Sequence, residues 1–524
     1  MAEQWAELNQ ETIDRMLGGE YPAALEAAKR AAACAESNGE QENLLVSLNN
    51  LGTVYQAVGD YENAEAALQR VRELTAAQYG ERDLRTADAI YELAALAAES
   101  GKPEQAEGLL QESVAIREAA DAEDKSALIQ DLTALAENQR AQGHLGAAQA
   151  SLERAVSLTE AQAGEDSPAL GGVLTRLAAV YQADQQLEKA GDTLRRAAKI
   201  YENTVGAAHP AFAEVLAGLA DNYVARGAAQ GAEPLYEQAI SILKQSLGKE
   251  DPAVGGVAEK LAHLYLSTGR NDKAEGQLRK VLKIYQKAYG EGSAELSRVQ
   301  NDLGECYLAE NKPDEAEPLL RAALEAREKL LGENHPAVAQ SLNDLAMLLE
   351  NQGKYDEAAP LDERALKIRR AAFGERHVAV TQSLENLAAV YQQLGRLPDA
   401  EDLLREAVSI WQENVGDDHP ATMQATFGLA TILYLRVKYR EAEKLLAQVE
   451  ETTLRHLDAE DPSMAPVYKA IGAVKEKLGK DDEAKDYALR FGRLLQKNKP
   501  QPADQQTPKP QTKIKPKGSR KLPS

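Results

Sequence analysis

The residues best suited to metal binding or acid–base chemistry are seven histidines and two cysteines, spread over 524 residues. Four of the histidines recur at multiples of 42 residues, and three of these precede a proline: His209, His335, His377 and His419. Recurrence at a fixed period indicates a structural role. We therefore expect these four rings to satisfy helix-end carbonyls or loop backbone groups, and we predict no metal site.

Signatures of catalysis are missing from the sequence. It contains no Gly-rich phosphate loop, no nucleophile elbow, no paired-cysteine zinc spacing and no helical His-Glu-x-x-His. The two cysteines, Cys34 and Cys306, lie 272 residues apart and form no disulfide framework. We therefore expect a protein that is not an enzyme and that has no catalytic residues and no cofactor.

The charge of the chain excludes one class of partner. The net charge is −23, but residues 498–524 carry seven Lys or Arg against one acid, so the first 497 residues carry −29. Such a body repels phosphate backbones, and we expect it to bind no nucleic acid.

No basic segment leads into an apolar one at the amino terminus, and no run of 18 apolar residues occurs. We therefore expect a cytoplasmic protein without a membrane segment.

One pattern recurs every 42 residues without insertion or deletion. Its leading apolar residue, here called the anchor, is always followed by Gly or Ala, and an Ala always stands thirteen residues after the anchor. The eleven anchors are Leu51, Leu93, Leu135, Leu177, Leu219, Leu261, Leu303, Leu345, Leu387, Leu429 and Ile471. The small residue beside each anchor lets a second helix approach closely, so each unit is predicted to be a packed helix pair. We call the helix with the anchor helix A and the next one helix B.

The turn between helices A and B has its own signature eight residues after the anchor. Glycine stands there in eight of eleven repeats, where it can adopt the left-handed conformation that ends a helix. Asn311 can substitute for glycine, whereas Gln185 and Val437 do so at a greater cost, so we expect those two turns to differ. A further pair at residues 5–16 and 20–36 precedes the first anchor, which brings the predicted number of pairs to twelve.

The motif L-[GA]-x-x-Y, then Gly, then Ala resembles the tetratricopeptide repeat (TPR), and the 42-residue unit is similar to the kinesin-light-chain and nephrocystin-like type. The resemblance rests on SLNNLGTVYQAVGDYENAEAAL at 47–68, SLNDLAMLLENQGKYDEAAPLDERALKIRRAAFGERH at 341–377 and SLENLAAVYQQLGRLPDAEDLLREAVSIWQENVGDDHP at 383–420. It implies an all-α fold, a right-handed superhelical α-solenoid of about twelve antiparallel helix pairs. We expect a capping pair at 1–44, eleven units at 45–497 and a disordered Pro/Lys-rich basic tail at 498–524.

Polar side chains on helix A are the candidate binding residues. Positions five, two and one before the anchor and two after it share a face of helix A, which we expect to line a concave groove. Amides dominate this face in the carboxy-terminal half, and amides can pair with the backbone of an extended peptide. The candidates are Arg298, Asn301, Gln340, Asn343, Asp344, Gln382, Asn386 and Gln424, with Asn50 in the first half. In kinesin light chains asparagines line the cargo groove, and the resemblance places Asn50, Asn343 and Asn386 at such positions.

The sequence thus predicts a scaffold that binds peptide segments of partner proteins along the groove. Two alternatives stay open: a hydrated concave surface without a particular ligand, and an assembly or regulatory module that dimerises or docks a separate enzyme through its convex or terminal surfaces. An exposed apolar patch on the last repeats would favour that module. The basic tail can contact an acidic surface or serve only to keep the chain soluble.

Overall fold

The computed structural model describes residues 2–497, and the predicted tail at 498–524 lies outside them. The described residues form 24 α-helices, a short 3₁₀-helix and no strand. The predicted all-α solenoid of twelve helix pairs is therefore confirmed. Every odd-numbered α-helix is a helix A and every even-numbered one is a helix B.

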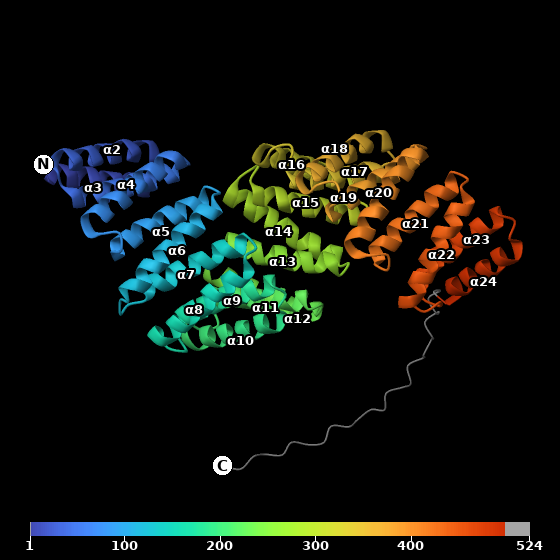
Figure 1. The fold of residues 1–524 in the computed structure, drawn as a ribbon, viewed down its shortest axis with the longest axis horizontal. Helices are drawn as coiled ribbons and strands as arrows, with labels where there is room; N and C mark the ends of the chain where they lie inside the picture. The colour runs from blue at the N-terminus through green and yellow to red at the C-terminus, as the bar shows by residue number, and fades with distance from the viewer. Residues whose placement is uncertain (1, 498–524) are drawn as a thin grey trace, which may run out of the picture. The chain divides into compact units, whose positions relative to one another are not determined.

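The chain divides into two compact units, one ending at Gly290 and the other beginning at Glu291, a division that the uninterrupted period does not predict. The first unit holds seven pairs, stacked in chain order (Figure 1): α1 Ala2–Leu17 and α2 Tyr21–Asn38, α3 Gln41–Ala57 and α4 Tyr61–Tyr79, α5 Leu84–Glu99 and α6 Pro103–Ala120, α7 Ser126–Ala141 and α8 Leu145–Ala163, α9 Pro168–Ala183 and α10 Leu187–Thr204, α11 Pro210–Ala225 and α12 Ala229–Ser246, α13 Pro252–Ser267 and α14 Asn271–Tyr289. Helix α3 begins inside residues 1–44, the predicted capping unit.

The second unit holds the other five pairs: α15 Ala294–Ala309 and α16 Pro313–Leu331, α17 Pro336–Asn351 and α18 Tyr355–Phe373, α19 Val378–Gln393 and α20 Leu397–Val415, α21 Pro420–Leu435 and α22 Tyr439–His456, and α23 Ala465–Lys477 and α24 Asp481–Lys497. The 3₁₀-helix Pro462–Met464 leads into α23. Within each unit a helix A packs on its own helix B, and that helix B packs on the helix A that follows. None of the described helices is long and apolar enough to span a membrane.

Small residues set the distance between the helices of a pair. A Cβ built on Gly304 would lie 2.6 Å from a methyl group of Leu320, so a larger residue there would force the Leu320 side chain on α16 to shift. The alanine thirteen residues after the anchor has no exposed surface in ten repeats, from Ala64 to Ala442. In the last repeat the equivalent Ala484 is only half-buried, because no further helix A follows α24 in the described residues.

The turns at Gln185 and Val437 do not differ from the others, contrary to expectation. All eleven residues at this position have positive φ, between 57° and 80°, including Gln185 at 57° and Val437 at 63°. The N–H of Val437 donates to the carbonyl of Tyr434 at 3.0 Å and the N–H of Lys438 to that of Leu433 at 2.9 Å. This is the hydrogen-bond pattern that closes helix A at the glycines as well. The packing of the pair therefore imposes a left-handed residue whatever its side chain.

Candidate binding face of the A helices

The A helices of the second unit expose a short column of polar side chains. Arg298, Gln382 and Gln424 stand five residues before their anchors on α15, α19 and α21, and all three are exposed. Gln340, at the same position on α17, is half-buried, as is Asn386 one residue before its anchor on α19. These five residues are the predicted candidates of the second unit whose side chains reach solvent.

Two of the predicted asparagines lie under this surface. Asn301 and Asn343 stand two residues before their anchors, are 2% and 3% exposed, and face the next helix A. The amide nitrogen of Asn301 donates to Glu305 Oε1 and to Asp344 Oδ2, both at 2.8 Å. Its oxygen accepts from Ser341 Oγ at 3.0 Å. The expectation that these amides are free for a peptide backbone is therefore wrong for this column, because the side chains already link successive A helices.

The same arrangement recurs one repeat later. Asn343 Oδ1 accepts from Ser383 Oγ at 3.3 Å, and Asn343 Nδ2 donates to Asp362 Oδ1 at 2.5 Å. Arg369 of α18 donates to Ser383 Oγ at 2.6 Å and to Gln340 Oε1 at 3.2 Å. This network fixes the rotation of α17 against α19 and engages the Gln340 side chain.

The equivalent arginine of α16 completes the first network. Arg327 donates to Asn301 Oδ1 at 3.2 Å, to Ser341 Oγ at 2.7 Å and to the carbonyl of Ala337 at 3.2 Å. Burial lowers the pKa of Arg327, while the carboxylates around it act in the opposite direction. A half-buried guanidinium that donates to three acceptors on two helices is a structural group, and it holds α15 and α17 in register.

Two carboxyl groups, one on α15 and one on α17, have raised pKa values. Burial, with the negative charges of Asp344 and Asp302, raises the pKa of Glu305 to about 8. Burial also raises the pKa of Asp344, which is 6% exposed and accepts from Gln340 Nε2 at 2.9 Å. Glu305 therefore keeps its proton to a higher pH than an ordinary glutamate, and its hydrogen bond with Asp344 acts in the same direction. Glu305 and Asp344 can thus hold one proton between their carboxyl groups. Asp344 was predicted to line the groove, but its side chain is engaged inside the fold.

Asp362 is a buried residue that the sequence analysis missed. It has no exposed surface and stands seventeen residues after its anchor, where eight of the eleven repeats have Leu. Burial raises the pKa of Asp362 to about 7. Its second carboxylate oxygen, Oδ2, has no hydrogen-bond partner among the described residues. A comparison of the residues seventeen positions after each anchor would have identified Asp362, because it is the only acid among them.

The first unit contributes fewer free polar groups to this face. Asn50 Nδ2 donates to Asn9 Oδ1 at 2.8 Å and thereby links α3 to α1. Two basic residues of the face are paired with acids from the preceding helix A: Arg176 with Glu137 at 2.6 Å and Lys260 with Asp221 at 2.7 Å. Their charges are compensated within the fold, which reduces the attraction of this face for acidic peptides.

A hollow of about 520 Å³ lies in the first unit, between α3 and α5 and above α4. Its lining is Glu42, Leu45, Val46, Asn49, Thr53, Gln56, Leu68, Val71, Thr75, Tyr79, Arg85, Asp88, Ala89 and Glu92. The sequence analysis missed this site as well. The signal is Val46, an apolar residue five positions before its anchor that is 42% exposed, where five of the ten later repeats have Arg or Gln.

The four recurring histidines are helix N-caps. In each, Nδ1 accepts a hydrogen bond from the backbone N–H two residues on, at 3.1 to 3.2 Å, as the cap of α11, α17, α19 or α21. The role is structural, but the partner differs from the two that were predicted: each ring accepts from an N–H in the first turn of a helix A, and not from loop backbone, and it satisfies no helix-end carbonyl. Other repeats have Asp or Ser as the cap at the same position, for example Asp251 and Ser167.

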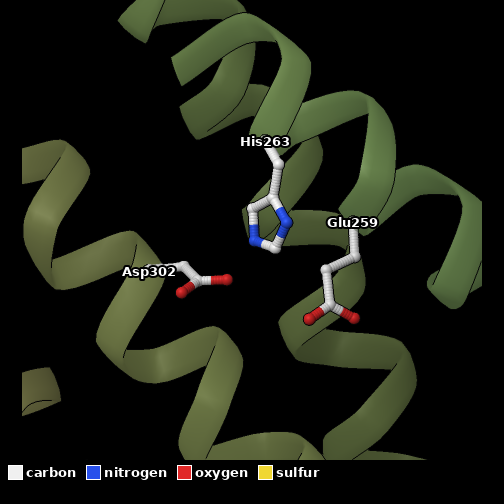
Figure 2. A group of neighbouring side chains, drawn as sticks. All are labelled: Glu259, His263 and Asp302. Atoms are coloured by element: carbon white, nitrogen blue, oxygen red, sulfur yellow. The ribbon is translucent and has the colours of Figure 1, made fainter. Parts of the chain in front are cut away.

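His263 is not one of the capping histidines. On α13, Glu259 and His263 lie one turn apart, and Asp302, also labelled in Figure 2, belongs to α15 of the second unit.

The fold and this face define a class, the helical-repeat proteins, and the comparisons give the family. The family described as tetratricopeptide repeat matches residues 12–77, 43–119, 170–245, 255–329, 312–371 and 377–455. The chain therefore belongs to the tetratricopeptide repeat family, as the sequence predicts.

Several solved structures are similar to the chain. BtubC (BKLC) from P. vanneervenii is 31% identical over 47% of this chain and 94% of its own, with a TM-score of 0.38. Two structures of a putative kinesin light chain from Podosopora anserina, with nearly identical TPR-like repeats, are each 27% identical. They cover 39% and 40% of this chain and 97% and 98% of their own, with TM-scores of 0.36. No curated protein matches significantly.

Proposed function

We propose that the chain is a non-enzymatic scaffold whose exposed and half-buried amides bind extended segments of partner proteins. The observation that carries the proposal is the set Gln382, Asn386 and Gln424 on the adjacent helices α19 and α21. None of the three side chains has a hydrogen bond to another described residue, unlike Asn301 and Asn343. An amide offers both donor and acceptor, so the set can pair with a peptide backbone of any sequence.

Family membership supports the general role, since tetratricopeptide arrays present extended surfaces to other proteins. The face of the second unit supports the particular mode. Its outermost groups are neutral amides with Arg298, so a bound segment is selected by main-chain pairing and shape more than by charge. In this proposal the protein binds its partners without catalysing a reaction, and any catalysis is carried out by those partners.

The test compares affinity capture by the full chain with capture by the variant Gln382→Ala, Asn386→Ala and Gln424→Ala, in lysate of the source organism. We expect quantitative mass spectrometry to show specific proteins lost from the variant. The control is Gln69→Ala, Gln111→Ala and Gln245→Ala, three exposed glutamines on B helices of the first unit. If both variants capture the same proteins as the parent chain, the amides are only a hydrated surface.

A second function, assembly through the last repeat, is favoured by the uncovered face of α23 and α24. A hollow of about 480 Å³ lies there, lined in part by Gly472, Ala473, Ala484, Ala488 and Phe491. Position 488 has Leu in most repeats, and its shortening to Ala opens this hollow. Assembly predicts that Ala484→Glu with Ala488→Glu converts a dimer into a monomer in sedimentation equilibrium. A parent chain that is monomeric at all concentrations excludes self-assembly.

A further inference from the structure

The hollow between α3 and α5 has an apolar strip along its base. Leu68 and Val71 of α4 lie at the base and are buried, and Leu45 and Val46 of α3 extend the apolar surface toward solvent. Val46 is 42% exposed. Because part of this strip is open to solvent, an aliphatic side chain placed on it would remove apolar surface of both partners from water.

Three polar side chains around the strip have no partner within the fold. Glu42 and Asn49 of α3 and Glu92 of α5 are exposed, and none of these side chains makes an ion pair or hydrogen bond with another described residue. Asn49 stands two residues before its anchor, as Asn301 and Asn343 do, but those two are engaged with the next helix A. The amide of Asn49 is therefore available to the backbone of a bound chain.

The charge of the hollow is negative. Asp88 shares Arg117 with Asp131, at 2.8 and 2.7 Å, so one cation compensates two acids. Glu92 lies one turn from Asp88 on α5, and partial burial together with the Asp88 charge raises the pKa of Glu92. Arg85, the one basic residue among the described lining residues, pairs at 2.8 Å with the acid that caps α5. A cation beside Glu42 or Glu92 would therefore be attracted without displacing an existing ion pair.

A second acidic hollow, at α1, lacks the apolar strip. Its described lining is Ala6, Glu7, Gln10, Glu11, Asp14, Arg15 and Glu20, in which one alanine is the only apolar residue. It has four acids and one arginine, against three acids and one arginine between α3 and α5. Negative charge is therefore common to both hollows. The apolar strip between unpaired acids distinguishes the hollow between α3 and α5.

The positions of the two glutamates set the spacing of a matching ligand. Glu42 stands nine residues before its anchor and Glu92 one before its own, a difference of eight positions, or about 12 Å along the helix axes. Val46, five before its anchor, lies halfway between these heights. An extended chain covers about 12 Å in about four residues, and its side chains at i, i+2 and i+4 share one face. Basic side chains at i and i+4 with an aliphatic one at i+2 therefore match the hollow.

We propose that the hollow between α3 and α5 binds an extended segment of a partner protein that has two lysine or arginine side chains four residues apart and an aliphatic one midway between them. The cations pair with Glu42 and Glu92, the aliphatic side chain lies against Val46, and the amide of Asn49 pairs with the main chain of the segment. This goes beyond the proposed capture by α19 and α21, whose amides carry no charge, because it gives the first unit a ligand selected by the spacing of its charges.

The test uses the full chain and a fluorescein-labelled peptide, Ser-Gly-Lys-Ser-Leu-Ser-Lys-Ser-Gly, followed by fluorescence anisotropy. We expect saturable binding that weakens as salt is added. Glu42→Gln with Glu92→Gln should weaken it at least tenfold. The matched control, Glu7→Gln with Asp14→Asn, removes two acids from the α1 hollow and should change the affinity less than twofold.

A cycle of protein and peptide variants tests the apolar contact. A peptide with Ser in place of Leu should bind the parent chain at least threefold more weakly. Val46→Ser should weaken binding of the leucine peptide by a similar factor and leave binding of the serine peptide unchanged, because the two changes remove the same contact. A general loss of fold would weaken both peptides alike. Circular dichroism of each variant establishes that it is folded.

Three results would each overturn the proposal: no saturable binding, equal affinity for a peptide whose two lysines are adjacent, or equal losses in the Glu42 and Glu92 variant and in its control. A dimer of the parent chain that Val46→Glu converts into a monomer would also overturn it, since a second copy would then cover the hollow. None of these outcomes depends on Gln382, Asn386 or Gln424, so the two proposals fail separately.

Discussion

Asn343 donates a 2.5 Å hydrogen bond to Asp362 across the pair α17 and α18, at a position where eight repeats pack a leucine. The pair is buried, and the other oxygen of Asp362 lacks a described partner. A buried polar pair of this kind contributes less to stability than an apolar contact of the same size. It does fix which face of α18 meets α17, because only one rotation joins the two side chains.

Replacing the pair should stabilise the second unit. Asp362→Leu with Asn343→Thr restores the residue types of repeats such as the one with Leu152 and Thr133. We expect the free energy of unfolding to rise by about 1–4 kcal/mol in urea titrations. Asn343→Ala alone, which leaves the carboxyl without a donor, should lower it by about 1–3 kcal/mol. A double variant that is less stable than the parent would mean that the polar pair is itself stabilising.

The stability of the second unit should fall between pH 5 and pH 8. The folded-state pKa is about 7 for Asp362 and about 8 for Glu305, above the ordinary values of about 4. The folded chain therefore retains protons that the unfolded chain releases, and the stability they provide is full below about pH 4 and lost as the pH rises through 7 to 8. Urea midpoints at pH 5 and pH 8 measure the loss. It should shrink in Asp362→Leu with Asn343→Thr and in Glu305→Gln, and an unchanged loss would assign it to other groups.

Relief of the left-handed backbone at Val437 should also stabilise the fold. A β-branched residue at φ 63° is strained, whereas glycine adopts this conformation freely. We expect Val437→Gly to raise the free energy of unfolding by about 1 kcal/mol, since the strain relieved exceeds the added entropy of the unfolded chain. The reciprocal change in the preceding repeat, Gly395→Val, should lower it by about 1–2 kcal/mol. Equal and small effects in both would show that the turn relaxes to accept either residue.

The histidine caps should be replaceable by acids but not by alanine. His335→Ala removes the acceptor for the N–H of Ala337 and should destabilise the chain by about 0.5–2 kcal/mol. His335→Asp should be neutral or stabilising at pH 7, because Asp251 caps α13 in the same way and an acid suits a helix N-terminus. Thermal unfolding followed at 222 nm measures both variants. Destabilisation by the two changes alike would point to a role for the ring beyond capping.

The 42-residue period was sufficient to predict the helix pairs, because the anchor, the small residue beside it and the alanine of helix B are all set by one local packing problem. The caps and the left-handed turns belong to the same repeated backbone. The state of Asn301 and Asn343 could not be predicted this way. Positions two and one before the anchor are adjacent on helix A, and the rotation between successive A helices decides which of them is buried. The shifted pKa values of Glu305 and Asp362 depend on that burial and follow only from the coordinates.

The half-buried Ala484 makes the end of the array mechanically distinct. Ten alanines at its position are clamped by helices on both sides, whereas α23 and α24 are held only through α22 and α21. Under a stretching force applied to the chain ends, this pair can detach without first breaking open a closed interface, as can the amino-terminal pair α1 and α2. Extension would then begin at the ends of the array and proceed inward, one helical hairpin per step, so that the molecule would lengthen in equal increments before its interior yields.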